Sequence, residues 1–335
     1  MGRWRGLSEE RVRAGWIAPI ALLGSPAAAV DPGYWTALRA VDARMATIAY
    51  RLATGNAALC RELQPVPGLQ LHAIDQYDGD AQAGARAAFG FATPVQVEAM
   101  APDGPAARAG VLADDGVVAV DGMALPTPAP GTAATSATRD AAQALIAAQS
   151  PAAPLRLTLE RAGVRRTVTI PASPGCRSAF EVLLGPGLKA SSDGQVVQVG
   201  AVFFERFDDG AVAAIVAHEL AHTVLRHRVR LEAAGVHWGL AGEFGRNARL
   251  FRRTEEEADR LSVHLLRNAG YDPQAAVRFW REEGGRIDGG MFRSATHPSA
   301  KARADAVAAE AATLPPPGVP DDAPAILATR DQPLS

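Results

Sequence analysis

AVAAIVAHELAHTVLRH, residues 211–227, combines an apolar helical pattern with the motif H-E-x-x-H. Residues four apart lie on one face of a helix, so His218 and His222 can direct two imidazoles at one ion. Glu219 would project beside them toward a bound water. The pattern therefore predicts a hydrolytic zinc site with His218 and His222 as ligands and Glu219 as general base, and such a site needs a third protein ligand.

The stretch TEEEADRLSVHLLRNAGYDP, residues 254–273, contains the best candidates for that third ligand. Its apolar residues recur at helical spacing, so Glu255 and Asp259 share a face. A His, His and Glu set leaves the fourth zinc position for water, and Asp259 could accept the free ring N–H of a ligand histidine. The alternative is that the glutamates at 255–257 form a solvated acidic first turn, which is favourable at a helix N-terminus.

Four motifs follow one another along the C-terminal part of the chain: HELAH, E-x-x-A-D, AGYDP and THPSAKAR, the last at residues 296–303. With these motifs the chain resembles metallopeptidase family 48, the family of HtpX and the CAAX prenyl endopeptidases. Its soluble periplasmic branch, which includes BepA-like proteases, fits better than the membrane-spanning branch because no long apolar segment is present. The resemblance is weak over residues 34–80 and strong over residues 176–311.

This resemblance implies a zinc endopeptidase with one Zn²⁺ per chain. It implies His218, His222 and Glu255 as ligands and Glu219 as base, because the E-x-x-A-D register selects Glu255 over the next two glutamates. The chain departs from the family at residues 188–192, LKASS, where an Asn-Ala type strand often grips the substrate backbone. Substrate contacts of that strand are therefore not carried over.

The resemblance also places the Thr-His-Pro loop near the active site. We expect His297 or Arg303 to face the cleft as a catalytic residue, either as an oxyanion stabiliser or as an occluding ligand in a resting state. The alternative is a helix-start turn followed by a salt-bridging arginine. Both residues are retained as candidates.

His227 is a weaker candidate for the metal site. It lies five residues after His222 and would sit off the ligand face of a continuous helix, so we expect it to be structural or surface-exposed. A metzincin would need a histidine at the next position, which is Arg228. His72, His237 and His264 are expected to be ordinary packed or exposed residues.

Residues 86–172 resemble a PDZ domain. Phe89, Gly90 and Phe91 match its carboxylate-binding loop, and the segment LRLTLERAGVRRTVTIPA predicts a hairpin that turns at Ala162 and Gly163. A PDZ groove binds an extended peptide as an added strand, so this module would capture substrate tails through those loop residues. The alternative is a rigid structural module that binds no peptide.

The N-terminus has the pattern of a signal peptide. Four arginines precede the apolar stretch AGWIAPIALLG, and small residues at 27–29 offer a cleavage site near Ala29. The mature chain would then be periplasmic or secreted, whereas an uncleaved amphipathic extension is the alternative. Export would place Cys60 and Cys176 in an oxidising compartment, where they would form a disulfide worth about 4 to 5 kcal/mol or remain two free thiols.

Composition limits the partners. The net charge is −2 and the chain has no basic footprint for nucleic acid, while mean hydropathy near zero excludes a polytopic membrane protein. Peripheral membrane association is left open. The expected partners are unfolded segments or C-terminal peptides of protein substrates.

These observations predict an α+β protein, a mainly helical zincin-type metallopeptidase with an inserted β-rich PDZ-like domain. We expect an endopeptidase that hydrolyses unfolded or misassembled envelope proteins; a latent protease that acts as a peptide-binding adaptor or chaperone is the competing hypothesis. The expected ranges are a signal peptide (1–29), the first part of the peptidase (30–85), the PDZ-like domain (86–172), the catalytic domain (173–312) and a Pro-rich disordered tail (313–335).

Overall fold

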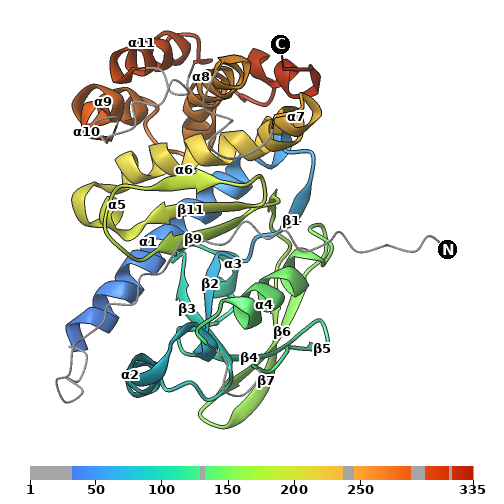
Figure 1. The fold of residues 1–335 in the computed structure, drawn as a ribbon. Helices are drawn as coiled ribbons and strands as arrows, with labels where there is room; N and C mark the ends of the chain where they lie inside the picture. The colour runs from blue at the N-terminus through green and yellow to red at the C-terminus, as the bar shows by residue number, and fades with distance from the viewer. Residues whose placement is uncertain (1–31, 129–132, 237–244, 288–298, 317–318, 335) are drawn as a thin grey trace, which may run out of the picture.

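The computed structural model describes residues 32–128, 133–236, 245–287, 299–316 and 319–334. Helices gather in one part of the molecule and a six-stranded sheet forms the other, with the long helix α1 (Pro32–Gly55) running through both (Figure 1). The predicted α+β class is therefore confirmed. The predicted signal peptide lies outside the described residues.

The helical part is built around α6 (Asp209–Val224), most of whose side chains are buried. The Asp208 carboxylate caps the helix by accepting the Ala211 N–H at 2.8 Å. Around α6 pack other helices of the same part: α5 (Ala201–Arg206), α7 (His227–Ala233), α8 (Gly245–Asn268) and α9 (Gln274–Glu282), with α10 (Gly284–Ile287) and α11 (Ala300–Ala311) beyond them. Their apolar faces form the largest core, which includes Leu220, Leu261 and Phe203.

A three-stranded sheet covers α6 on the side away from α8. Its order is β10 (Ala190–Ser192), β11 (Val196–Gly200) and β9 (Ala179–Leu183); β10 is antiparallel to β11, and β9 is parallel to it. Among the described residues, strand β10 is thus an edge strand of this sheet, next to α6.

The second part is a sheet in the order β2 (Leu69–Ala73), β3 (Val95–Met100), β4 (Gly116–Val120), β6 (Leu155–Arg161) and β7 (Val164–Ile170), with β5 (Met123–Ala124) paired to β4. Helices α2 (Gly79–Phe89), α3 (Pro105–Arg108) and α4 (Ala137–Ala147) accompany it. The β6–β7 hairpin turns at Ala162 and Gly163, both with positive φ, as expected.

This sheet begins earlier in the chain than residue 86, the expected start of the PDZ-like domain. Strand β2 pairs antiparallel with β3, with a register shift between Gln70 and Leu71. The reason is burial: Leu71 and Ala73 are 5% and 0% exposed in the same core as Val97. The segment from 69 therefore packs with the sheet rather than with the first part of the peptidase.

The C-terminal segment also differs from expectation. We predicted a disordered tail from residue 313, but a 3₁₀ helix, η4 (Ala325–Asp331), packs against α8 and buries Ile326 in the main core. Arg330 donates to the Leu59 carbonyl at 2.8 Å. The Pro-rich composition predicted disorder, but the burial of Ile326 and the hydrogen bond of Arg330 hold this segment in place.

The segments that enter and leave the sheet region are paired as strands and joined by a disulfide. β1 (Leu63–Pro65) pairs with β8 (Pro174–Cys176), and a disulfide links Cys60 to Cys176 across 116 residues of sequence. Of the two expected alternatives, the structure has the bridge. None of the described helices is long and apolar enough to cross a membrane.

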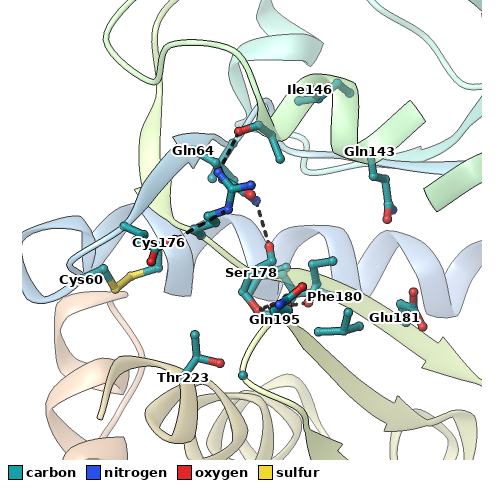
Figure 2. Close-up of a pocket in the computed structure, with 18 of the residues that line it drawn as sticks. Cys60, Gln64, Gln143, Ile146, Cys176, Ser178, Phe180, Glu181, Gln195 and Thr223 are labelled. Carbon is teal, nitrogen blue, oxygen red and sulfur yellow. Dashed lines mark hydrogen bonds and ion pairs between the residues drawn. A yellow bond between two sulfur atoms is a disulfide. The ribbon is translucent and has the colours of Figure 1, made fainter. Parts of the chain in front are cut away.

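A cavity of about 880 Å³ lies between the two parts of the molecule. Its walls include Gln70 of β2, Gln143 of α4 and Phe180 of β9, and the disulfide lies beside it (Figure 2). It extends to Thr223 and His222 at the end of α6. One continuous space therefore borders both the sheet region and the end of α6.

Candidate metal centre

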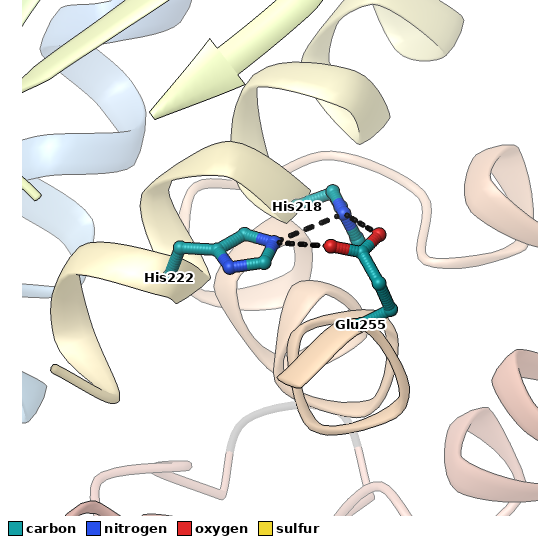
Figure 3. Close-up of side chains that lie close together, drawn as sticks. All are labelled: His218, His222 and Glu255. Atoms are coloured by element: carbon teal, nitrogen blue, oxygen red, sulfur yellow. Dashed lines mark hydrogen bonds and ion pairs between the residues drawn. The ribbon is translucent and has the colours of Figure 1, made fainter. Parts of the chain in front are cut away.

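Three side chains from two helices converge at the centre of the helical part. His218 and His222 lie one turn apart on α6, and Glu255 projects from α8, which packs against α6 (Figure 3). The two Nε2 atoms are 3.3 Å apart, and Glu255 oxygens lie 3.3 Å from that of His218 and 3.4 Å from that of His222. The helical spacing in the sequence thus becomes a compact group of three donors.

These separations fit a zinc ion. Donor atoms at about 2.0 to 2.2 Å from zinc, arranged at tetrahedral angles, lie about 3.3 to 3.6 Å from each other. Imidazole nitrogens and a carboxylate oxygen are also donors that zinc accepts in catalytic sites, with one position left over. The residues present therefore fit Zn²⁺; their roles as ligands remain predictions.

The electrostatics around His218 favour a cation at this centre. Burial and the Arg303 charge lower its pKa, but hydrogen bonds to Asp259 and Glu255 outweigh them and raise it to about 10. For His222, burial holds the pKa well below the usual value despite Glu255. The carboxylates around His218 thus favour positive charge at this position, which a metal ion can supply in place of the ring proton, while burial favours the neutral form of His222.

Asp259 contacts His218 as the sequence pattern suggested. Its Oδ1 lies 3.0 Å from Nδ1 of His218, on the ring edge opposite the donor atom. Burial alone would raise the pKa of Asp259, but Arg303 and His218 have the larger, opposite effect and bring it below its usual value, so the carboxylate is ionised. A buried carboxylate here can accept the ring N–H and hold the imidazole in one orientation.

Arg303 is a buried ion-pair partner. Its Nε and Nη2 each donate to one Asp259 oxygen at 2.7 Å, and the guanidinium lies 3.5 Å from the centroid of the Trp280 ring. At 5% exposure it does not face an open cleft, although its Nη2 is 3.2 Å from the His218 ring nitrogens. Arg303 Nη2 also lies 3.6 Å from Oε2 of Glu255, so the arginine forms salt bridges beside the donor set, and a catalytic role for it stays a prediction. His297 lies outside the described residues.

Glu219, the predicted base, follows His218 on α6. It is half-buried, unlike the apolar residues that surround it in the helix. Its position in the motif puts it beside both histidines. The catalytic role of Glu219 stays a prediction.

The glutamates do not form a solvated first turn. Helix α8 begins at Gly245, so residues 255–257 lie in its middle. Glu257 is 5% exposed and is bound by Arg230 at 2.5 Å and by Arg253 at 3.1 Å. Burial raises the pKa of Glu257, but His227 and Arg230 lower it well below its usual range.

His227 is buried and lies outside the group of three donors, in keeping with the expected structural role, but the premise of a continuous helix is wrong. The helix ends at Val224, and Arg226 takes left-handed backbone angles (φ 56°, ψ 37°) before α7 starts at His227. This break turns His227 back toward α6, where its Nδ1 lies 2.9 Å from Nδ1 of His222. No local signal in the sequence announces a left-handed arginine, so the contact could not be foreseen.

The loop that resembles a PDZ carboxylate site is packed against α1. Phe89 and Phe91 are 5% and 6% exposed and cluster with Trp35. Gly90 has φ 81°, which suits glycine, and its N–H donates to the Arg86 carbonyl at 2.9 Å. That N–H is therefore not free for a peptide carboxylate, and peptide binding by these three residues stays a prediction.

Comparisons with known proteins agree with the helical part of this description. Residues 239–311 match the model of peptidase family M48. The match contains Glu255, Asp259 and Arg303 and starts after the H-E-x-x-H motif. These observations support a metallopeptidase of that family, with a zincin-type α+β fold.

A curated relative points the same way. The mitochondrial metalloendopeptidase OMA1 of Schizosaccharomyces pombe is 32% identical over 117 residues, which cover 29% of this chain and 34% of that protein. The chain thus spans about a third of the length of the relative it matches.

Proposed function

We propose that this chain is a zinc-dependent endopeptidase of the M48 type, with His218, His222 and Glu255 as ligands. The observation that carries the proposal is the convergence of three side chains from two packed helices: the two Nε2 atoms are 3.3 Å apart, and each lies 3.3 to 3.4 Å from one of the two Glu255 oxygens. When bound, zinc supplies a Lewis acid that polarises the scissile carbonyl and acidifies water. Glu219 takes the proton of the attacking water and returns it to the leaving amine.

The ligand residues are held by their surroundings. Asp259 orients His218, and Arg303 keeps that carboxylate ionised and in place. A fixed donor set does not have to reorganise when the substrate carbonyl arrives, which lowers the barrier for attack.

For substrates we propose unfolded or misassembled proteins of the cell envelope, bound in an extended form. Two features support this. In the described residues β2 pairs only with β3, which leaves an edge beside α4, and the cavity runs from this edge to His222. An extended peptide can add to such an edge and reach the metal centre without folding.

A periplasmic or secreted location is part of the proposal. The arginine-led apolar N-terminal segment and the Cys60–Cys176 disulfide both support export, because disulfides persist in oxidising compartments. Expression in cells followed by fractionation and N-terminal sequencing tests it. A mature N-terminus near residue 30 in the periplasmic or extracellular fraction is expected, whereas full-length cytosolic protein would contradict it.

The activity is tested by zinc content and casein cleavage of the purified protein, compared with Glu219→Gln. One zinc per chain in both proteins, with cleavage only in the parent, is expected. Zinc in both with cleavage in neither would favour the latent, peptide-binding adaptor. Cleavage in both would remove Glu219 from the mechanism.

A further inference from the structure

A buried chain of hydrogen bonds leads away from His222 on the side opposite its donor atom. The His222 and His227 Nδ1 atoms are 2.9 Å apart, and His227 Nε2 lies 3.2 Å from Oε2 of Glu257. His227 and Glu257 are 1% and 5% exposed. Three residues from α6, α7 and α8 are thereby connected in one line.

The positions of the protons along this line follow from the chemistry of imidazole. His222 Nε2 faces Glu255 and His218, so it must carry a lone pair if it is to bind a metal, which leaves the proton of the neutral ring on Nδ1. Two Nδ1 atoms at 2.9 Å need one donor and one acceptor. His222 therefore donates, His227 accepts, and the proton of His227 lies on Nε2, where Glu257 accepts it.

Both rings are neutral in this arrangement. The charge of the line lies on Glu257, whose carboxylate is bound by Arg230 and Arg253.

Glu257 itself is fixed from three sides. Arg230 of α7 donates to it at 2.5 Å and Arg253, one turn earlier on α8, at 3.1 Å. From the C-terminal segment, the Thr329 hydroxyl donates to it at 3.3 Å, and Arg230 also donates to the Gln332 carbonyl at 3.0 Å. A carboxylate held by these partners cannot rotate away from His227.

We infer that His227 and Glu257 are positioning residues that set the tautomer and the ring orientation of the metal ligand His222. The inference rests on the proposed zinc site. It gives the two histidine ligands equivalent support: Asp259, held by Arg303, contacts His218 directly, while Glu257, held by Arg230, acts on His222 through His227. Neither His227 nor Glu257 touches the reacting atoms.

The test compares His227→Phe with His227→Gln. Phenylalanine fills the space without any hydrogen bond, whereas a glutamine amide can accept from His222 and donate to Glu257, as the imidazole does. Zinc affinity is measured by competition with a chromophoric chelator, and thermal unfolding verifies that each variant is folded. We expect zinc binding about 10- to 100-fold weaker in His227→Phe, and most of that loss recovered in His227→Gln.

His264→Phe is the matched control. His264 is also buried and also lies between two carboxylates, Asp321 at 2.7 Å and Glu310 at 3.2 Å, but it does not contact the metal centre. Its variant should lose stability and keep the zinc affinity of the parent. An equal loss of zinc affinity in His264→Phe and His227→Phe would assign the effect to general destabilisation and overturn the inference.

A spectroscopic measurement covers the case in which His227→Phe does not fold. Long-range ¹H–¹⁵N spectra of the zinc-loaded parent report which ring nitrogen of each histidine carries a proton. We expect Nδ1 of His222 and Nε2 of His227 to be protonated, with Nδ1 of His227 bare. A protonated Nδ1 on His227 would overturn the inference, while a parent protein that binds no zinc would overturn the proposed function itself.

Discussion

The metal centre and the junction between α1 and the sheet treat buried carboxylates in opposite ways. At the metal centre, Arg303 and His218 hold the pKa of Asp259 below its usual range despite burial, and His227 and Arg230 do the same for Glu257. At the junction, burial together with Glu98 raises the pKa of Asp42 to about 7, and Arg139 only partly offsets them. The helical part thus keeps its buried acids charged, whereas the junction favours a neutral one.

This difference teaches where the chemistry lies. Ionised carboxylates oriented by arginine are what a cation site and its histidines need. The aromatic loop next to the junction uses Phe89 and Phe91 for packing against Trp35 instead. The metal centre pairs its carboxylates with arginines, and the aromatic loop packs its side chains against α1.

The sharpest test of the first region is Glu219→Gln. Removal of a general base costs about 10²- to 10⁴-fold in rate, and zinc should stay bound because Glu219 is not a ligand. The rate of cleavage of a fluorogenic peptide, with zinc measured on the same sample, checks this. Loss of zinc together with activity would instead make Glu219 part of the donor set.

Arg303→Met should have the next largest effect. It removes the arginine that pairs with the buried charge of Asp259 and leaves only His218 beside that carboxylate, so we expect the free energy of unfolding to fall by about 3 to 5 kcal/mol. Urea unfolding measures it. As a control, Arg278→Met breaks an exposed pair with Asp272 and should cost less than about 1 kcal/mol. Similar losses in both variants would erase the contrast between buried and surface pairs.

The junction between α1 and the sheet should make the protein less stable as pH rises. Because the folded pKa of Asp42 is raised, its contribution to stability is complete below pH 4 and is lost as pH rises through about 7. Between pH 5 and pH 8 the free energy of unfolding of the parent should therefore fall by up to about 2 kcal/mol more than that of Asp42→Asn. Urea midpoints of both proteins at the two pH values decide the point. If the variant keeps the pH dependence of the parent, another group is responsible.

The smallest effect is expected in the cavity. Gln143→Trp places a larger side chain on the cavity wall formed by α4 and narrows the cavity. The KM for an unfolded protein should rise a few-fold, which corresponds to about 1 kcal/mol of binding free energy, while kcat for a short peptide stays the same. The control is Val164→Trp. Val164 is an exposed residue of β7 in the six-stranded sheet and does not line the cavity. Equal KM values in parent and Gln143→Trp would remove the cavity from substrate binding.

Periodicity explains what the sequence could predict. His218 and His222 share a face because a helix repeats every 3.6 residues, and the same rule puts Glu255 and Asp259 together on the second helix. The α+β class followed from such helices beside alternating strands, and the comparisons agree with it. Local rules were sufficient for these features because each depends on residues only a few positions apart.

Other features depend on contacts between distant segments. The left-handed backbone at Arg226, which brings His227 to His222, is stabilised by the packing of α7 on α8 and not by its own residue type. The inclusion of β2 in the sheet and the docking of Ile326 likewise follow from tertiary burial. No local pattern predicts such contacts.

The disulfide has a consequence if the chain is the protease proposed above. Cys60 and Cys176 close a covalent ring that contains the six-stranded sheet with its connections. A single self-inflicted nick within this ring would open a strand connection without releasing a fragment, since both halves remain tethered. Nicked molecules would run as one band on a gel until reductant is added, and as two bands afterwards.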